Sequence, residues 1–237
     1  MIEPGNGPEV VKEARADAGK DAGAQTMGFV LAGGRSSRMG ADKALIRLAG
    51  QPLIAHALAI LQQAGLDASI AGARSSLSDF APVIQDAYPD RGPLAGICSA
   101  LVSTSARHAV FLPVDLPCLP ASLVSFLLHH AGVAGGAVTV TSINGYAQTF
   151  PAVVDREALP VLEASLKGGQ GGCFSAFKAA AAQTRQPLSV LAVELLVQSG
   201  QIAHPDGLPA VFWFKNVNTP EDLDRAETIL ANSHRVS

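Results

Sequence analysis

Strand-like apolar runs alternate with helix-like patterns along almost the whole chain after Met27. The strand-like runs are short and rich in aliphatic residues, and the segments between them carry apolar residues at helical spacing. Such alternation builds a mostly parallel sheet with helices on both faces, so the sequence predicts an α/β fold. We expect strands at 28–32, 67–72, 81–86, 108–115, 136–142, 149–155 and 210–217, and helices at 52–64, 93–102, 120–130, 156–166 and 220–230.

The segment after the first predicted strand, residues 33–43, has the composition of a phosphate-binding loop. Gly33 and Gly34 allow a sharp turn and a close approach of the backbone to a ligand. The N–H groups of such a turn bind phosphate oxygens, and cationic residues of the loop, Arg38 and Lys43 among them, add positive charge. The spacing matches neither G-x-G-x-x-G nor a P-loop. The alternative is an ordinary glycine turn with surface arginines, but cations directly after an apolar strand favour phosphate binding.

Two aspartates end predicted strands at the edge of the sheet where this loop lies. Asp86 ends the third predicted strand and Asp115 ends the fourth. Ligands of parallel sheets bind beyond the carboxyl ends of the strands, so both carboxylates face the loop if these two strands are neighbours. A carboxylate beside a polyphosphate requires a cation, for which Mg²⁺ is the natural choice. A turn or helix-cap role is the alternative, favoured for Asp86 taken alone, whereas the prolines around Asp115 favour a functional position.

Composition argues against several classes of protein. A formal net charge of −3 and an aromatic content of 5% provide neither a basic field nor a stacking platform, so we expect no nucleic-acid partner. The cysteines Cys98, Cys118 and Cys173 are far apart and predict reduced thiols in a cytoplasmic protein. No apolar run reaches the roughly 18 residues of a membrane span. Residues 1–26 predict a disordered N-terminal extension, which leaves 27–237 as one domain.

The glycine loop is the first of several motifs that together resemble the molybdenum cofactor guanylyltransferase family. The resemblance covers about Met27 to Leu230 and is far more specific than any one motif. The motifs follow in the family's order as LAGGRSSRMGADKAL (31–45), GQPLIAHAL (50–58), DAYPDRGPLAGICSAL (86–101), FLPVDLPCLP (111–120) and FKNVNTPEDL (214–223).

This resemblance implies a single-domain, Rossmann-like nucleotidyltransferase fold with a mostly parallel sheet and one antiparallel strand. It also implies an activity, the transfer of GMP from Mg-GTP to molybdopterin-bound molybdenum with release of pyrophosphate. GTP and Mo-molybdopterin would be the substrates and Mg²⁺ the cofactor. Molybdopterin-handling proteins or molybdoenzyme chaperones would be candidate partners.

The resemblance also assigns roles to residues of this sequence. Asp86 would help to hold the nucleoside, and Asn216 would lie near the metal and the acceptor. The residues expected to bind nucleotide are Leu31, Ala32, Gly33, Gly34, Lys43, Asp86 and Asp115. The residues expected to act in catalysis are Lys43, Arg38 and Asp115, and those expected to hold the metal are Asp115 and Asn218.

Two segments depart from the family pattern, and three other functions stay open. SIAGAR (69–74) lacks an asparagine that the family often uses as a nucleotide contact, and GGQGGCF (168–174) stands where relatives carry charged residues. A CTP-dependent cytidylyltransferase is the nearest alternative, against which Gly33 and the GPLAG segment argue. A sugar-1-phosphate nucleotidyltransferase shares the loop but not the NVNTPEDL ending. A non-catalytic nucleotide-binding partner in molybdoenzyme maturation would bind nucleotide without releasing pyrophosphate.

Overall fold

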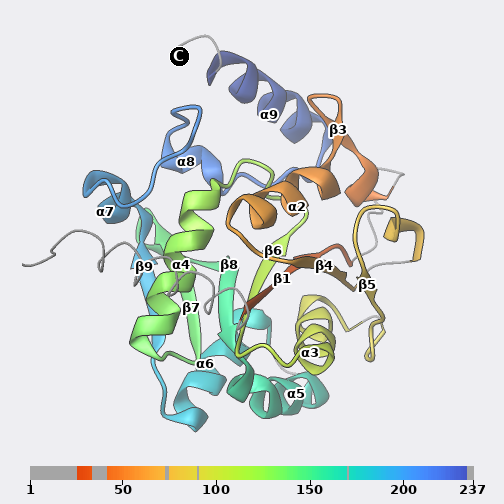
Figure 1. Cartoon of the computed structure of the whole chain (residues 1–237), viewed down its shortest axis with the longest axis vertical. Helices are drawn as coiled ribbons and strands as arrows, with labels where there is room; N and C mark the ends of the chain where they lie inside the picture. The colour runs from red at the N-terminus through yellow and green to blue at the C-terminus, as the bar shows by residue number, and fades with distance from the viewer. Residues whose placement is uncertain (1–25, 34–41, 73–74, 90, 170, 234–237) are drawn as a thin grey trace, which may run out of the picture.

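The computed structural model describes residues 26–33, 42–72, 75–89, 91–169 and 171–233. At its centre lies a seven-stranded sheet in the order β5-β4-β1-β6-β8-β7-β9 (Figure 1). Strand β8 runs antiparallel to both of its neighbours, whereas the other pairs are parallel. The predicted α/β fold with one antiparallel strand is therefore confirmed. The strands are β1 (Thr26–Leu31), β4 (Ala68–Ala71), β5 (Val83–Ile84), β6 (His108–Pro113), β7 (Val138–Ile143), β8 (Tyr146–Asp155) and β9 (Leu188–Ala192).

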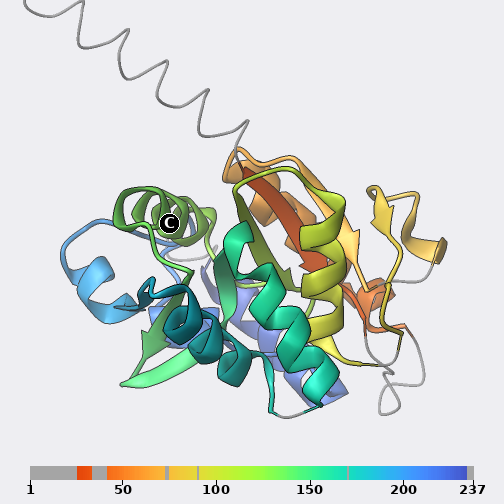
Figure 2. The same cartoon turned by 90° about the horizontal axis from the view of Figure 1, so that it is seen from below.

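Helices cover both faces of the sheet (Figures 1 and 2). One apolar core lies under α2 and α4 and continues toward the C-terminal helices, and a second lies under α3, α5 and α6. The helices are α2 (Leu53–Gln63), α3 (Pro93–Ser103), α4 (Ala121–Ala134), α5 (Leu159–Gly168), α6 (Cys173–Thr184), α7 (Val193–Gln198), α8 (Ala210–Trp213) and α9 (Pro220–Ser233). The short elements are the 3-10 turns η1 (Lys43–Leu45), η2 (Ser75–Leu77) and η3 (Arg156–Ala158) and the hairpin of β2 (Arg47–Leu48) and β3 (Gln51–Pro52).

Strand β1 shows how the sequence divides its side chains between the two cores. Val30 joins the core under α2 and α4, whereas Phe29 and Leu31 join the core under α3 and α5. Phe29 stacks on Phe111 of the neighbouring strand β6, with 5.6 Å between the ring centroids. Because β1 is buried on both faces, its sequence is a continuous apolar run and not an alternation of apolar and polar residues.

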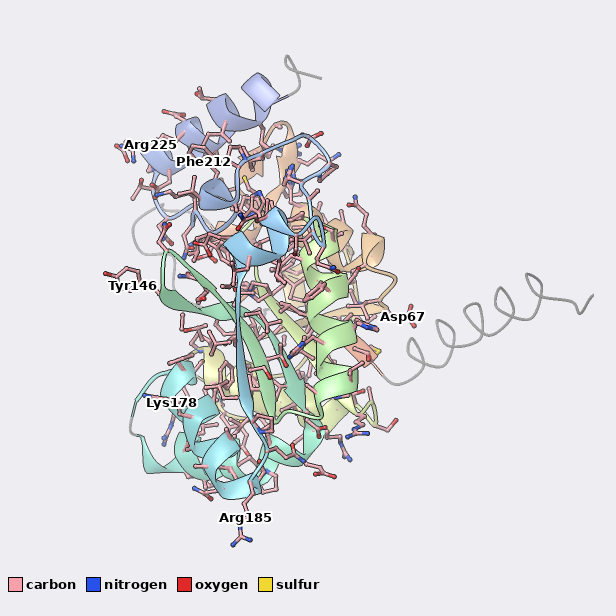
Figure 3. The ribbon with its side chains drawn as sticks, turned by 90° about the vertical axis from the view of Figure 1, so that its left-hand side faces the viewer. Asp67, Tyr146, Lys178, Arg185, Phe212 and Arg225 are labelled. Carbon is pink, nitrogen blue, oxygen red and sulfur yellow. The ribbon has the colours of Figure 1, made fainter. Side chains whose placement is uncertain are left out.

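The β7–β8 hairpin extends beyond the end of the central strands. Phe111 pairs with Ala152, so the first residues of β8 lie past the last residue of β6. Tyr146, the first residue of β8, is 76% exposed and points away from the body of the protein (Figure 3). The hairpin therefore stands above the edge at which the parallel strands end.

The C-terminal third differs from the sequence prediction. Residues 210–217, predicted as a strand, form helix α8 and a loop, so that prediction is wrong. Trp213 is buried, and its Nε1 donates a hydrogen bond to the Leu208 carbonyl at 2.7 Å. A short apolar run does not distinguish a strand from one buried helical turn. Helix α6, strand β9 and helix α7 were not predicted, and the third predicted strand shortens to β5.

Part of the N-terminal prediction lies outside the described residues. The predicted extension falls mainly on 1–25, which the structure does not describe, so it stays a prediction. Strand β1 begins at Thr26, one residue before the predicted domain boundary. Among the described helices, none combines the length and apolar character that crossing a membrane requires.

Candidate active site

The ends of three adjacent strands place the glycine turn. Leu31, the last residue of β1, pairs with Ala71 of β4 on one side and with Pro113 of β6 on the other. The ladder continues one residue further on both sides. The Ala32 N–H donates to the Ala71 carbonyl and the Val114 N–H donates to the Leu31 carbonyl, each at 3.1 Å. The chain thus leaves β1 in register with both neighbours and reaches Gly33 at the carboxyl edge of the sheet.

Gly33 is required by backbone packing. A Cβ built on Gly33 would lie 2.5 Å from the carbonyl oxygen of Gly72, which no side chain can occupy. Gly72 itself has a φ of +71° and follows the end of β4. Gly96 of α3 is also close, because a Cβ there would lie 3.7 Å from the Gly72 nitrogen. From the sequence, Gly33 was expected to let a ligand approach the backbone closely. The structure adds a second reason for glycine, which is the contact between the turns at Gly33 and Gly72.

Lys43 and Asp115 form the charged centre of this edge. Lys43 begins η1, whose first turn is capped by Asp42, because the Asp42 Oδ1 accepts a hydrogen bond from the Ala44 N–H at 3.1 Å. The Lys43 Nζ lies 2.7 Å from the Asp115 Oδ2, and both side chains are about one-fifth exposed, at 20% and 18%. The Lys43 Nζ also donates a hydrogen bond to the Asn218 Oδ1. Asn216 donates from its Nδ2 to the same Asp115 oxygen at 3.4 Å.

The loop that carries the two asparagines is anchored on both sides. The Val217 N–H donates to the backbone carbonyl of Asp115 at 3.0 Å, and the Val217 side chain is buried. The Asp222 Oδ2 accepts hydrogen bonds from the Asn218 and Thr219 N–H groups at 3.1 and 3.0 Å, and the Asn218 contact lowers the pKa of Asp222. The Thr219 Oγ1 accepts from the Asp222 N–H at 3.2 Å, which completes a capping box at the start of α9.

Asp86 lies at the same edge but apart from Asp115. The predicted third and fourth strands are not neighbours, because β4 and β1 lie between β5 and β6. Three strand spacings of about 4.8 Å place the two strand ends about 14 Å apart. The sequence pattern identified both strand ends but could not order the strands. Asp86 and Asp115 therefore flank the glycine turn from opposite sides.

The Asp86 side chain is held by its own loop and by α3. Its Oδ1 accepts from the Tyr88 N–H at 2.9 Å and from the Ser99 hydroxyl at 3.1 Å. The Tyr88 hydroxyl donates to the Glu163 Oε1 on α5 at 2.9 Å, and this bond raises the pKa of Tyr88. A cavity of about 310 Å³ lies beside this loop and is lined by Tyr88, Pro89, Arg91, Leu166 and Lys167. It includes neither Lys43 nor Asp115.

The remaining predicted residues fall into two groups, one at the end of β1 and one outside the described residues. The Leu31 side chain is buried, Ala32 is half-buried and Gly33 is exposed, so Leu31 presents only its backbone at this edge. Gly34 and Arg38 lie outside the described residues. The supporting residues Gly72, Thr219 and Asp222 were not predicted. The T-x-x-D pattern at 219–222 could have identified the cap, because it precedes a helical apolar pattern.

Solved structures with this architecture define the class. The chain is similar to molybdopterin-guanine dinucleotide biosynthesis protein A from Archaeoglobus fulgidus, with a TM-score of 0.70, 23% identity and coverage of 87% of this chain and 99% of that one. It is also similar to a Mycobacterium tuberculosis protein solved in complex with manganese, with a TM-score of 0.57, 20% identity and coverage of 86% and 98%. A nucleotidyl transferase from Methanothermobacter shares this architecture with a TM-score of 0.65, so the chain has the fold of a nucleotidyltransferase.

Sequence comparison identifies the family within this class. The model of the MobA-like NTP transferase domain matches residues 28–186, and the chain belongs to this family. A relative from Vibrio atlanticus, named molybdenum cofactor guanylyltransferase, is 31% identical over 210 residues, which cover 86% of this chain and 97% of the relative. The resemblance found in the sequence motifs is therefore confirmed.

Proposed function

We propose that this protein transfers GMP from Mg-GTP to Mo-molybdopterin and releases pyrophosphate, forming the guanine dinucleotide form of the molybdenum cofactor. The observation that carries the proposal is the contact between Lys43 and Asp115 beside the glycine turn. The contact places a lysine ammonium, suited to phosphate, and a carboxylate, suited to a metal ion, at the carboxyl edge of the sheet, where ligands of such folds bind. The choice of substrates is supported by the name of the Vibrio atlanticus relative.

The residues at this edge fit a magnesium ion that is shared with a nucleotide. Among the described residues, no group of three or more His, Cys, Asp or Glu side chains could hold a metal. Mg²⁺ does not need one, because it commonly takes one or two carboxylates together with phosphate oxygens and water. Asp115 would supply the carboxylate and Asn218 an amide oxygen. When bound, Mg²⁺ would neutralise phosphate charge, and the manganese complex of the M. tuberculosis neighbour is consistent with a divalent ion in this fold.

The proposed reaction needs no activated side-chain nucleophile. A terminal phosphate oxygen of the acceptor attacks the α-phosphorus of GTP in line, a new P–O bond forms, and the bond from the α-phosphorus to the bridging oxygen breaks. Pyrophosphate leaves with the electron pair of the broken bond. Catalysis then depends on position and charge. Lys43, Arg38 and the N–H groups of the glycine turn would stabilise the phosphates.

The nucleoside would lie across the strand ends from the phosphates. We assign its binding to Asp86 on one side of the glycine turn, with Leu31, Ala32, Gly33 and Gly34 contributing backbone groups. The separation of Asp86 from Asp115 supports this division, because a nucleotide is an elongated ligand with its base and its terminal phosphates at opposite ends. Asn216 would act through Asp115, whose carboxylate it already contacts.

Thermal unfolding with GTP, CTP or UTP, each with and without Mg²⁺, tests the nucleotide. A ligand at 100 times its dissociation constant adds about 2.7 kcal/mol of stability, which a melting curve resolves. We expect selective, magnesium-dependent stabilisation by GTP. Selectivity for CTP would instead support the cytidylyltransferase, and selectivity for UTP a sugar-1-phosphate enzyme. No response to any nucleotide would contradict nucleotide binding at this edge.

Pyrophosphate release tests the transfer itself. We expect release from Mg-GTP only when Mo-molybdopterin is supplied, because the acceptor provides the nucleophile. Nucleotide binding without release in the presence of the acceptor would instead identify a non-catalytic partner in molybdoenzyme maturation. The two outcomes differ in the chemistry and not in the binding, so the melting experiment and the release experiment must be read together.

A further inference from the structure

The Lys43 ammonium contacts the same oxygen atoms that the proposed function assigns to the metal. It lies 2.7 Å from the Asp115 Oδ2 and donates to the Asn218 Oδ1, so it bridges the turn after β6 and the loop before α9. A carboxylate oxygen and an amide oxygen are the donors that Mg²⁺ takes. In this structure one positive charge of the chain itself therefore satisfies the proposed metal ligands.

We propose that Lys43 is a built-in substitute for the metal, and that Mg²⁺ and the nucleotide together displace it. This inference rests on the proposed function, because the nucleotide phosphates are the new partners of the displaced ammonium. With Lys43 in place, a lone divalent ion meets a positive charge at its own ligands. Without phosphates, the displaced lysine would also lose the carboxylate that it contacts in a partly buried position.

The surrounding contacts allow this exchange with little change in the backbone. Asp42 caps η1, and Ala44, the residue after Lys43, is buried, so the lysine backbone is fixed on both sides. On the opposite side, Asp222 holds the backbone of Asn218. Only the long Lys43 side chain has to rotate. The metal ligands are therefore already in position, and the lysine controls access to them.

The consequence is cooperative binding of metal and nucleotide. A ligand shifts the equilibrium between two states of a protein only as far as its affinities for those two states differ. Here the states differ in whether Lys43 or the metal occupies the oxygens of Asp115 and Asn218. We expect wild-type protein to bind a divalent ion weakly without nucleotide. Removing the ammonium should raise that nucleotide-free affinity by about tenfold or more, within the usual range of coupling between sites.

Titration with Mn²⁺, followed by electron paramagnetic resonance of the free ion, tests this directly and needs no turnover. The variant Lys43→Met removes the charge and keeps the aliphatic length, and Lys43→Arg keeps the charge. The matched control is Lys167→Met, which removes a 67% exposed lysine on α5. We expect tighter nucleotide-free Mn²⁺ binding in Lys43→Met alone. The double variant Lys43→Met/Asp115→Asn should lose the gain, which would place the ion at Asp115.

The outcomes separate this proposal from the proposed function. If Lys43→Met binds Mn²⁺ no more tightly than wild type, while Mg-GTP still stabilises the wild-type protein, the exchange is wrong and the function stands. If Mn²⁺ binding tightens in Lys43→Met but the wild-type protein neither binds nor turns over any nucleotide, Lys43 still competes with the metal, whereas the proposed function and the displacement of Lys43 by nucleotide are both wrong. A gain that survives in the double variant would overturn the site. Melting curves of each variant confirm folding, and Lys43→Gln serves as a second variant if Lys43→Met does not fold.

Discussion

At the scale of single residues, the site depends on two kinds of contact. The first is the charge contact of Lys43 with Asp115, which brings together residues 72 positions apart in the chain. The second is the backbone contact of Gly33 with Gly72, which leaves no room for a side chain. In the proposed function the charge contact selects the ligand, and the glycine contact fixes where the turn after β1 begins.

Replacing Asp115 by Ala should abolish metal-dependent turnover. The carboxylate is the acidic group that contacts Lys43, and its loss removes a proposed metal ligand and leaves the ammonium with Asn218 alone of these two partners. We expect pyrophosphate release to fall by about 10²–10³-fold or more, the usual effect of losing a group that stabilises developing charge. Near-normal pyrophosphate release by Asp115→Ala, measured at saturating Mg²⁺ and GTP, would contradict the assignment of Asp115 as a metal ligand.

Replacing Gly33 by Ala should destabilise the protein through the Gly72 carbonyl. The new Cβ would lie 2.5 Å from that backbone oxygen, so one of the two turns must move. We expect a loss of about 1–3 kcal/mol in the free energy of unfolding, as for other forced overpacking, and weaker stabilisation by nucleotide. Gly132→Ala in α4 is the matched control, because its Cβ would meet nothing within 4 Å and should stabilise the helix by about 0.5–1 kcal/mol. Equal denaturation midpoints for the two variants would contradict the packing argument.

At the scale of elements, the start of α9 determines the position of Asn218. The cap is reciprocal, because Asp222 accepts from the backbone of residues 218 and 219 and Thr219 accepts from Asp222. Figure 1 shows α9 beside the β2–β3 hairpin, where the Ala49 N–H donates to the Glu227 Oε1 at 3.4 Å. The helix therefore connects the asparagine loop to the segment that follows Lys43.

Replacing Asp222 by Ala should weaken both the helix and the site. We expect a lower free energy of unfolding, because the capping box at the start of α9 loses one of its two side chains. We also expect less magnesium-dependent stabilisation by GTP, because the Asn218 backbone would lose its anchor. Asp224→Ala, an exposed carboxylate of the same helix, is the control and should keep the nucleotide response. A full nucleotide response in Asp222→Ala would show that the cap does not position the loop.

The strands also show which parts of the fold could be predicted from sequence patterns and which could not. The strands before the glycine turn and before Asp115 were predicted because each is a buried apolar run followed by a distinctive turn. Strand β9 was missed because it lies at the sheet edge and is only partly buried, which leaves a weak pattern. The order of the strands depends on packing across the sheet, so the positions of Asp86 and Asp115 relative to each other could not be predicted from the sequence. The Gly33–Gly72 contact leaves no local signal either.

At the scale of the whole molecule, the two ends of the central strands differ: the candidate site lies where the parallel strands end, and a polar cluster lies where they begin. The carboxyl edge carries the candidate site. The opposite edge carries a buried polar cluster, in which the His108 Nε2 lies 3.6 Å from the Asp155 Oδ2 and has no hydrogen-bond partner among the described residues. Arg107 reaches the same carboxylate oxygen at 3.3 Å. We assign this cluster to stability and not to binding.

Stability should fall on acidification through His108. Burial lowers its pKa below the ordinary value of 6.5, although the nearby Asp155 carboxylate partly opposes the shift. Below about pH 6.5 the unfolded chain therefore binds a proton that the folded protein does not, so the unfolding free energy decreases as the pH is lowered toward the folded-state pKa. Denaturant unfolding between pH 7.5 and 5 checks this. The variant His108→Gln should flatten the curve relative to His129→Gln, an exposed control, and an unchanged slope would rule out His108 as the cause.

The contact between Lys43 and Asn218 joins residues 175 positions apart. During synthesis the glycine turn, β6 and most of both cores emerge long before the asparagine loop is available. The proposed ligand set is therefore completed only after the asparagine loop has been made, well after the segments that form most of both cores. A chain released before that loop could bury much of its apolar surface and still lack the complete set of groups at the carboxyl edge.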